Sequence, residues 1–141
     1  MARIDYKDGY YEGCVKNGLS HGYGVYKITS GELKGTTYTG QFKNDKFHGI
    51  GKLVTPSGHT YEGRFYQGTA HGHGVMIYEN GNIYEGNFVN NIITGKGKFF
   101  WINGDVYVGE FLNDKPHGHG KLKYKNGTVQ RGKFENGKFI G

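Results

Sequence analysis

A tyrosine recurs every 23 residues through most of this chain, and this period constrains the fold more than any other sequence feature. The repeated position is occupied by Tyr38, Tyr61, Tyr84, Tyr107 and, at the next place, Gln130. A glycine follows each of these positions by two residues and a phenylalanine by four, as in Gly40 and Phe42. A fixed period of this length predicts a repeat architecture, in which each unit packs on its neighbours.

The period divides the chain into five whole units with half a unit at each end. The predicted units are 11–37, 38–60, 61–83, 84–106 and 107–129, with half repeats at 1–10 and 130–141. The first unit has four extra residues around 33–36, and Val15 takes its phenylalanine position. The opening half repeat has a turn that is one residue shorter than the others.

Each unit is predicted to be a β-hairpin, because its two halves alternate with the period of a strand. A four-residue loop at 44–47 would pair Phe42 with Gly49 and Tyr38 with Leu53. A three-residue loop between units would then place Gly63 opposite Gly51. On this register one face carries a stripe of the repeated tyrosines and phenylalanines together with Tyr78, Trp101 and Tyr124.

The length of the loop between units decides whether that stripe forms. A two-residue loop would swap the faces at every repeat, and no continuous row of rings would result. We favour the three-residue loop, because it lets each phenylalanine lie over facing glycines. The expected fold is all-β: an elongated, single-layer, twisted antiparallel sheet of tandem hairpins.

Composition agrees with a thin sheet. The hydrophobic fraction is only 35%, whereas the chain contains 27 glycines and 16% aromatic residues. The single cysteine, Cys14, permits no internal disulfide, and neither a signal peptide nor an apolar membrane span is present in the sequence. We therefore expect a cytoplasmic location, with association to the cytoskeleton or to a membrane as a further expectation.

The repeated residues resemble those of the MORN repeat family. The family pattern, Tyr-Glu-Gly-x-Phe followed by His-Gly-x-Gly, is similar to residues 61–65 and 71–74 and to their counterparts in the other units. The sequence departs from the pattern at Val15, Thr94 and Gln130. The resemblance implies an elongated twisted sheet that binds proteins, in some cases further copies of itself, and in some cases membranes.

The aromatic stripe is the first candidate site, for a protein partner. A one-layer sheet has no second layer to cover its rings, so part of the stripe is expected to stay exposed and to bind an extended or helical segment. Packing of the rings on their own glycines is the alternative. The candidate partner-binding residues are Tyr38, Phe42, Tyr61, Phe65, Tyr84, Phe88, Trp101, Tyr107 and Phe111.

A second candidate site comes from the uneven distribution of charge. Residues 1–114 hold 11 Lys and Arg against 11 Asp and Glu, whereas residues 115–141 hold seven against Glu135 alone. An edge protected from aggregation by lysine is the simplest explanation, and an acidic protein or an anionic membrane is the alternative. The candidate anion-binding residues, all expected on the face opposite the rings, are Lys121, Lys123, Lys125, Arg131 and Lys133.

Catalytic and cofactor chemistry is not indicated. The pairs His71/His73 and His117/His119 could begin a zinc site, but the histidines recur at one repeat position, which favours a structural role. No nucleotide loop, nucleic-acid-reading motif or nucleophile–base pair is evident, so no cofactor, metal, catalytic residue or nucleic-acid partner is predicted.

Three functions remain open from the sequence. The preferred one is a non-enzymatic protein-interaction or assembly scaffold, with a homodimer through the open sheet edges as a second possibility for its partner. A peripheral membrane adaptor that uses the basic end is the main alternative. The third is a module of an enzyme.

Overall fold

The computed structural model describes all 141 residues as one antiparallel sheet of thirteen strands, each hydrogen-bonded to the strands next to it in the chain. It contains no helix. The strands are β1 (Ala2–Asp5), β2 (Gly9–Lys16), β3 (Leu19–Ile28), β4 (Thr37–Lys43), β5 (Lys46–Val54), β6 (Thr60–Tyr66), β7 (Thr69–Ile77), β8 (Ile83–Val89), β9 (Ile92–Phe100), β10 (Val106–Leu112), β11 (Lys115–Lys123), β12 (Val129–Glu135) and β13 (Lys138–Phe139).

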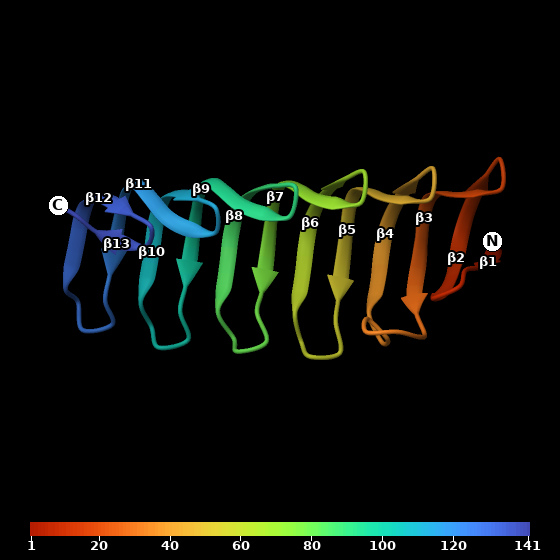
Figure 1. The fold of residues 1–141 in the computed structure, drawn as a ribbon, viewed down its shortest axis with the longest axis horizontal. Coiled ribbons are helices and arrows are strands. Elements are labelled where there is room, and N and C mark those ends of the chain that lie inside the picture. Colours follow the sequence, from red (N-terminus) through yellow and green to blue (C-terminus); the bar gives the residue numbers. More distant parts are fainter.

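The hairpins stand side by side in an elongated row with the chain termini at opposite ends (Figure 1). Turns within the hairpins lie along one long edge of the sheet, and the loops between hairpins lie along the other (Figure 1). The expectation of an all-β, single-layer array of hairpins is therefore confirmed.

The turn inside each hairpin is tighter than the sequence suggested. In the second unit Lys43 pairs with Lys46, and only Asn44 and Asp45, with φ of 49° and 69°, lie between them. Two adjacent residues with positive φ form the turn that matches strand twist best. The predicted pairing of Phe42 with Gly49 is wrong, because a bulge takes up the extra residues and Phe42 pairs with Phe47.

The loop between hairpins follows the prediction. In the loop after β5, Thr55 donates its N–H to the carbonyl of His59, which leaves the three residues 56–58 as the loop. Gly51 consequently pairs with Gly63, and Tyr38 with Leu53. The parity of the strands is kept across every unit. The tyrosines and phenylalanines therefore lie on one face, which we call the inner face.

Two irregular loops agree with the sequence. In the first unit the N–H of Ile28 bonds to the carbonyl of Thr36, so the loop is four residues longer than the others. In the opening half repeat the N–H of Tyr6 bonds to the carbonyl of Gly9, and the loop is one residue shorter. Neither change alters the face on which the following strand places its rings.

The core consists of tyrosine rings laid over facing glycines. A Cβ on Gly51 would overlap the Tyr38 ring, and one on Gly40 would lie 2.6 Å from the carbonyl oxygen of Ile50. The Tyr38 hydroxyl donates to the carbonyl of Gln41 at 2.7 Å, so its polar end is satisfied. Only glycine leaves room for this arrangement.

Each tyrosine also joins two hairpins. The Tyr38 ring meets Phe42 of its own hairpin at 4.9 Å and Phe65 of the next hairpin at 5.1 Å, both edge to face. This is a preferred geometry for aromatic pairs. Tyr61 and Tyr84 repeat the same two contacts with their own and the following phenylalanine.

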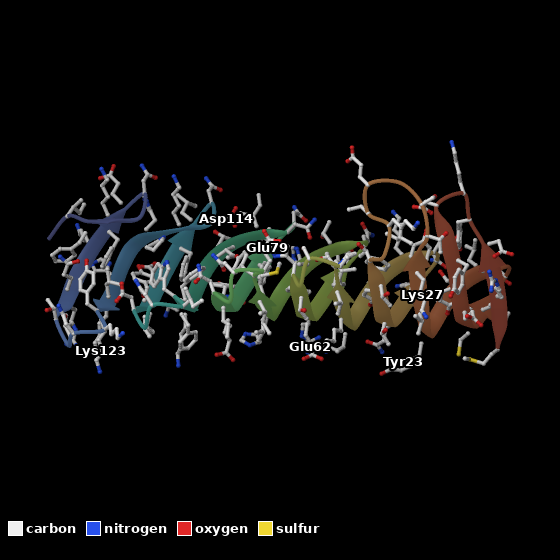
Figure 2. The ribbon with its side chains drawn as sticks, turned by 90° about the horizontal axis from the view of Figure 1, so that it is seen from below. Tyr23, Lys27, Glu62, Glu79, Asp114 and Lys123 are labelled. Carbon is white, nitrogen blue, oxygen red and sulfur yellow. The ribbon has the colours of Figure 1, made fainter.

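The predicted exposure of the repeated rings is wrong. The turn end of each hairpin bends over the inner face, so that phenylalanines close over the tyrosines. In Figure 2, Tyr23 and Glu62 project from one side of the ribbon, and Asp114 of a hairpin turn lies toward the other. No more than 5% of the surface is exposed in any of the eight rings Tyr38, Phe42, Tyr61, Phe65, Tyr84, Phe88, Tyr107 and Phe111.

Hydrogen bonds between successive turns hold neighbouring hairpins together. The N–H of Asn91 donates to the carbonyl of Ala70 in the preceding hairpin at 2.9 Å, and its side-chain oxygen accepts the N–H of Ala70 at 2.8 Å. Asp45 and Asp114 make the same pair of bonds, to Ser20 and Ile93. We call this pair of hydrogen bonds the clip between turns, because it joins the turn of one hairpin to the hairpin before it.

We expect Gly86→Val to destabilise the protein far more than Asn87→Val one residue further on. A Cβ on Gly86 would lie 2.5 Å from the Tyr84 hydroxyl and 2.6 Å from the Cα of Gly97, whereas Asn87 is exposed on the other face. Overpacking of this kind costs ~1–3 kcal/mol, and an exposed change usually stays within about 0.5 kcal/mol. Equal shifts in urea unfolding for the two variants would contradict the face assignment.

The clip between turns predicts a second pair of variants. Asn91→Gly keeps the backbone conformation, at φ of 71°, but removes the acceptor for the N–H of Ala70. A donor left unpaired costs about 1–3 kcal/mol, so the free energy of unfolding should fall by that amount. Asn90→Gly is the matched control, because Asn90 also has positive φ and makes no side-chain hydrogen bond. A loss as large in the control would show that the acceptor is not the cause.

Candidate interaction surfaces

A row of partly exposed apolar side chains runs beside the buried tyrosines on the inner face. Each member lies directly opposite a tyrosine across the hairpin, as Leu53 lies opposite Tyr38 and Met76 opposite Tyr61. These side chains are partly exposed, whereas the tyrosines that they face are buried. The row, which we call the inner row, consists of Tyr26, Leu53, Met76, Phe99 and Leu122.

Two further aromatic rings extend the inner row toward the loops between hairpins. The Phe99 ring lies 4.7 Å from Trp101 and 5.9 Å from Tyr78. Both Tyr78 and Trp101 are partly exposed and pack against the core. Trp101 is therefore the one predicted partner-binding residue that remains accessible.

The repeat pattern contains a signal for the inner row that the tyrosine and phenylalanine positions do not reveal. Large apolar residues occupy the same position of each unit, four residues after the first glycine of the Gly-x-Gly pair. The alternation of the second strand places that position on the tyrosine side. The recurring tyrosines and phenylalanines, by contrast, are the rings that the fold buries.

The outer face carries the basic residues. Lys121 lies directly opposite Arg131, and Lys133 lies opposite His119, on strands β11 and β12. A hollow of about 440 Å³ is lined by His119, Lys121 and Arg131 together with Val108 and three glycines. Four of the predicted anion-binding residues therefore share the expected face, and we call Lys121, Lys123, Arg131 and Lys133 the basic patch.

Lys125 does not belong to the basic patch. It lies in the loop after β11, where its N–H donates to Asp105 of the preceding loop at 2.9 Å. The prediction that it lies on a strand with the other four is therefore wrong. Strand β11 ends at Lys123 and a turn begins at Tyr124, so Lys125 lies outside the strand.

The outer face also has a larger hollow and an apolar row. The hollow, of about 730 Å³, is lined by residues of both charges, among them Glu85, Lys98 and Glu110. Beside it Ile77 pairs with Ile83 and Phe100 pairs with Val106, in register across four strands. Ile77 is 40% exposed and Phe100 is 36% exposed, so this row is a second apolar surface.

His117 and Ser20 form hydrogen bonds with residues of the hairpin turns. His117 accepts the N–H of Asn136 through Nδ1 at 3.3 Å, and the hydroxyl of the buried Ser20 donates to Asp45 at 3.1 Å. No group of three or more His, Cys, Asp or Glu side chains comes together to hold a metal ion. His73 and His119 instead line the outer hollow.

The buried tyrosine hydroxyls are hydrogen-bond donors. Burial raises the pKa of Tyr38 to about 12 and that of Tyr61 to about 12. Each hydroxyl therefore stays protonated near neutral pH and donates to a main-chain carbonyl, at 2.7 Å in Tyr38 and 2.8 Å in Tyr61. These hydrogen bonds stabilise the hairpin backbone beside the glycines.

The geometry defines a class of protein, a linear array of β-hairpin repeats that exposes two long faces for binding. The family model of the MORN repeat matches residues 11–32, 38–60, 61–83, 84–106 and 107–129. The chain belongs to the MORN repeat family, whose repeats mediate protein or membrane interactions in general and whose members are typically non-enzymatic scaffolds. No curated protein matches the chain significantly. No helix is long and apolar enough to cross a membrane.

Proposed function

We propose that the protein is a non-enzymatic scaffold that binds a segment of a partner protein along the inner row. The observation that carries the proposal is the continuity of that row over successive hairpins, from Leu53 to Phe99 and Trp101. Contiguous apolar surface of this kind marks partner sites, and tryptophan and tyrosine dominate their binding energy.

The buried core beneath the row supports the proposal. Tyr38, Tyr84 and Tyr107 are fully buried and joined to their neighbours by edge-to-face contacts, so the row stands on an ordered layer. A surface that is ordered before binding loses little conformational entropy when a partner docks. An extended or helical segment that lies along the row would contact several hairpins at once.

The partner surface is tested by placing charges on either face of the same two hairpins. Met76→Lys with Trp101→Lys disrupts the inner row, and Ile77→Lys with Phe100→Lys disrupts the outer apolar row as a matched control. The partner is first identified by mass spectrometry after capture from lysate with unmodified protein. The affinity of each variant for that partner is then measured. Loss of a central aromatic contact costs about 2 kcal/mol or more, so the inner variant should bind roughly 30-fold more weakly.

The outer variant should bind the partner as unmodified protein does. Circular dichroism and thermal unfolding establish that both variants keep the β-sheet. If the inner variant folds and binds normally, or if only the outer variant loses binding, the inner row is not the site.

A second candidate function, a peripheral membrane adaptor in the cytoplasm, rests on the basic patch. Lys121 and Arg131 lie directly opposite each other, as do Lys133 and His119, and no carboxylate pairs with any of these lysine or arginine residues. Like charges placed opposite each other destabilise a sheet slightly, so an anionic surface that relieves the repulsion is a natural ligand.

We expect unmodified protein to sediment with vesicles containing phosphatidylserine at low salt and to be released at high salt. Each basic residue near an anionic surface contributes about 1 kcal/mol, so reversing Lys121, Arg131 and Lys133 to Glu should weaken binding by at least about 100-fold. Reversing Lys52, Lys96 and Lys98, which lie elsewhere on the outer face, is the matched control. Protein that stays in the supernatant at low salt would contradict the adaptor function.

A further inference from the structure

A small cavity lined by aromatic rings and carboxylates lies on the inner face at the N-terminal end of the array. Its volume is about 330 Å³, and its walls include Tyr6, Tyr26, Phe47, Asp8 and Asp45. Tyr6 and Asp8 come from the loop between β1 and β2, Tyr26 from β3, Asp45 from the turn before β5 and Phe47 from β5 itself. Four separate segments of the chain thus meet at one place.

The rings are set at angles around the cavity and are not stacked on one another. The Tyr6 and Tyr26 rings are 5.7 Å apart and inclined by 51°, and the Tyr26 and Phe47 rings are 6.4 Å apart and inclined by 67°. Phe47 is held in place by stacking on Tyr38, at 3.9 Å and 5°. The Tyr6, Tyr26 and Phe47 rings remain partly exposed, so a ligand can reach the cavity from solvent, whereas Phe42, which also lines it, is buried.

The two carboxylates give the cavity negative charge without a counter-ion. Asp45 accepts hydrogen bonds from the Tyr6 hydroxyl at 2.8 Å and from the backbone and hydroxyl of Ser20, and Asp8 accepts one from the Tyr26 hydroxyl. Neither forms an ion pair. Burial opposes ionisation of Asp45, but the bonds from Ser20 and Tyr6 outweigh it and lower the pKa of its carboxyl.

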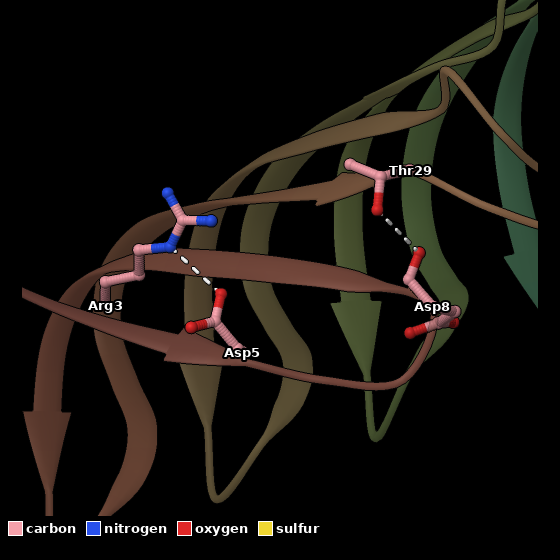
Figure 3. A network of polar contacts seen from close by, with 4 residues as sticks. All are labelled: Arg3, Asp5, Asp8 and Thr29. Carbon is pink, nitrogen blue, oxygen red and sulfur yellow. Dashed lines mark hydrogen bonds and ion pairs between the residues drawn. The ribbon is translucent and has the colours of Figure 1, made fainter.

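The surroundings of Asp8 are fixed by other contacts. Figure 3 shows the Thr29 hydroxyl bonded to the backbone carbonyl of Asp8, at 3.5 Å. It also shows Arg3, which pairs with Asp5 at 3.0 Å and not with Asp8. The charge of Asp8 is therefore available to a ligand in the cavity.

The repeat itself does not require these aromatic residues. The position of Phe47 is filled in the other whole units by Ser20, Ala70, Ile93 and Pro116. The position of Tyr26 is filled by Leu53, Met76, Phe99 and Leu122. Since the hairpin forms equally well with small or aliphatic residues at the first position and mostly aliphatic ones at the second, the fold does not explain why large rings converge here.

We propose that this cavity binds a methylated ammonium group, such as a quaternary ammonium. Ring faces attract cations through their negative quadrupole, and cages of aromatic rings are how proteins recognise methylated ammonium groups. Oδ1 of each carboxylate receives hydrogen bonds from the protein, which hold Asp8 and Asp45 in place beside the rings. Both carboxylates supply negative charge, which attracts a quaternary ammonium although it has no N–H to donate. The site shares Tyr26 with the inner row and lies at its N-terminal end, away from Met76 and Trp101.

The first test compares choline with its neutral carbon isostere, 3,3-dimethyl-1-butanol, by NMR titration of the full chain. The two have nearly the same shape, so their difference in affinity measures the contribution of the positive charge. Choline should bind at least about tenfold more tightly, with shifts in the resonances of Tyr26 and Phe47. Equal binding of both compounds, or no binding of choline, would overturn the proposal.

Variants that use the repeat's own residues separate binding from folding. Tyr26→Leu and Phe47→Ala introduce side chains that other units carry at the same positions, so the sheet should be retained. Each should weaken choline binding by about tenfold or more. Phe99→Leu is the matched control, because Phe99 occupies the position of Tyr26 in a unit without the cavity, and it should leave choline binding unchanged. Unchanged affinity in Tyr26→Leu and Phe47→Ala would place any choline site elsewhere and overturn the assignment.

Two further probes distinguish the sources of such a group. A peptide with trimethyllysine, compared with the same peptide carrying unmodified lysine, tests recognition of a methylated protein. Vesicles of phosphatidylcholine, compared with vesicles of phosphatidylglycerol, test recognition of a lipid headgroup. Preference for the first member of either pair, lost in Tyr26→Leu, supports the proposal and identifies the source. If unmodified protein shows neither preference, the proposal is contradicted.

Discussion

The tyrosine ring that lies across two facing glycines is the contact on which the rest of this structure depends. In each unit the glycines of neighbouring strands remove two side chains from the inner face, and the ring of a residue such as Tyr84 fills that space. Its hydroxyl reaches a carbonyl beyond the glycine, so a polar group is buried without loss. The thin sheet therefore makes a core without a second layer.

Cooperation between units follows from the same contact. Each tyrosine from Tyr38 to Tyr107 contacts a phenylalanine of its own hairpin and one of the next, so these units do not complete their cores alone. The clip between turns adds polar bonds of the same nearest-neighbour kind. It also tolerates variation: Gly137 has no side chain to accept a bond, and its partner Pro116 has no N–H to donate.

Because the repeated rings are buried in the core, other side chains form the surfaces that are open to partners. The eight tyrosines and phenylalanines are used by the fold, which leaves the inner row, the outer apolar row and the basic patch for partners. Departures from the repeat are the places where a local role is easiest to recognise. Phe47 and Tyr26 depart from it together and line one cavity.

The sequence alone determined the hairpin repeat, its 23-residue period, the three-residue loops between units and the face that each strand presents, because alternation and turn residues are local properties. It also determined that Lys121 and Arg131 share a face. Only the tertiary structure decided that the hairpins bend and close over their tyrosines, which removed Tyr38 and Phe42 from the surface and left Leu53 and Trp101 accessible. The bend depends on a bulge and on contacts between units, and neither can be read from one repeat taken by itself.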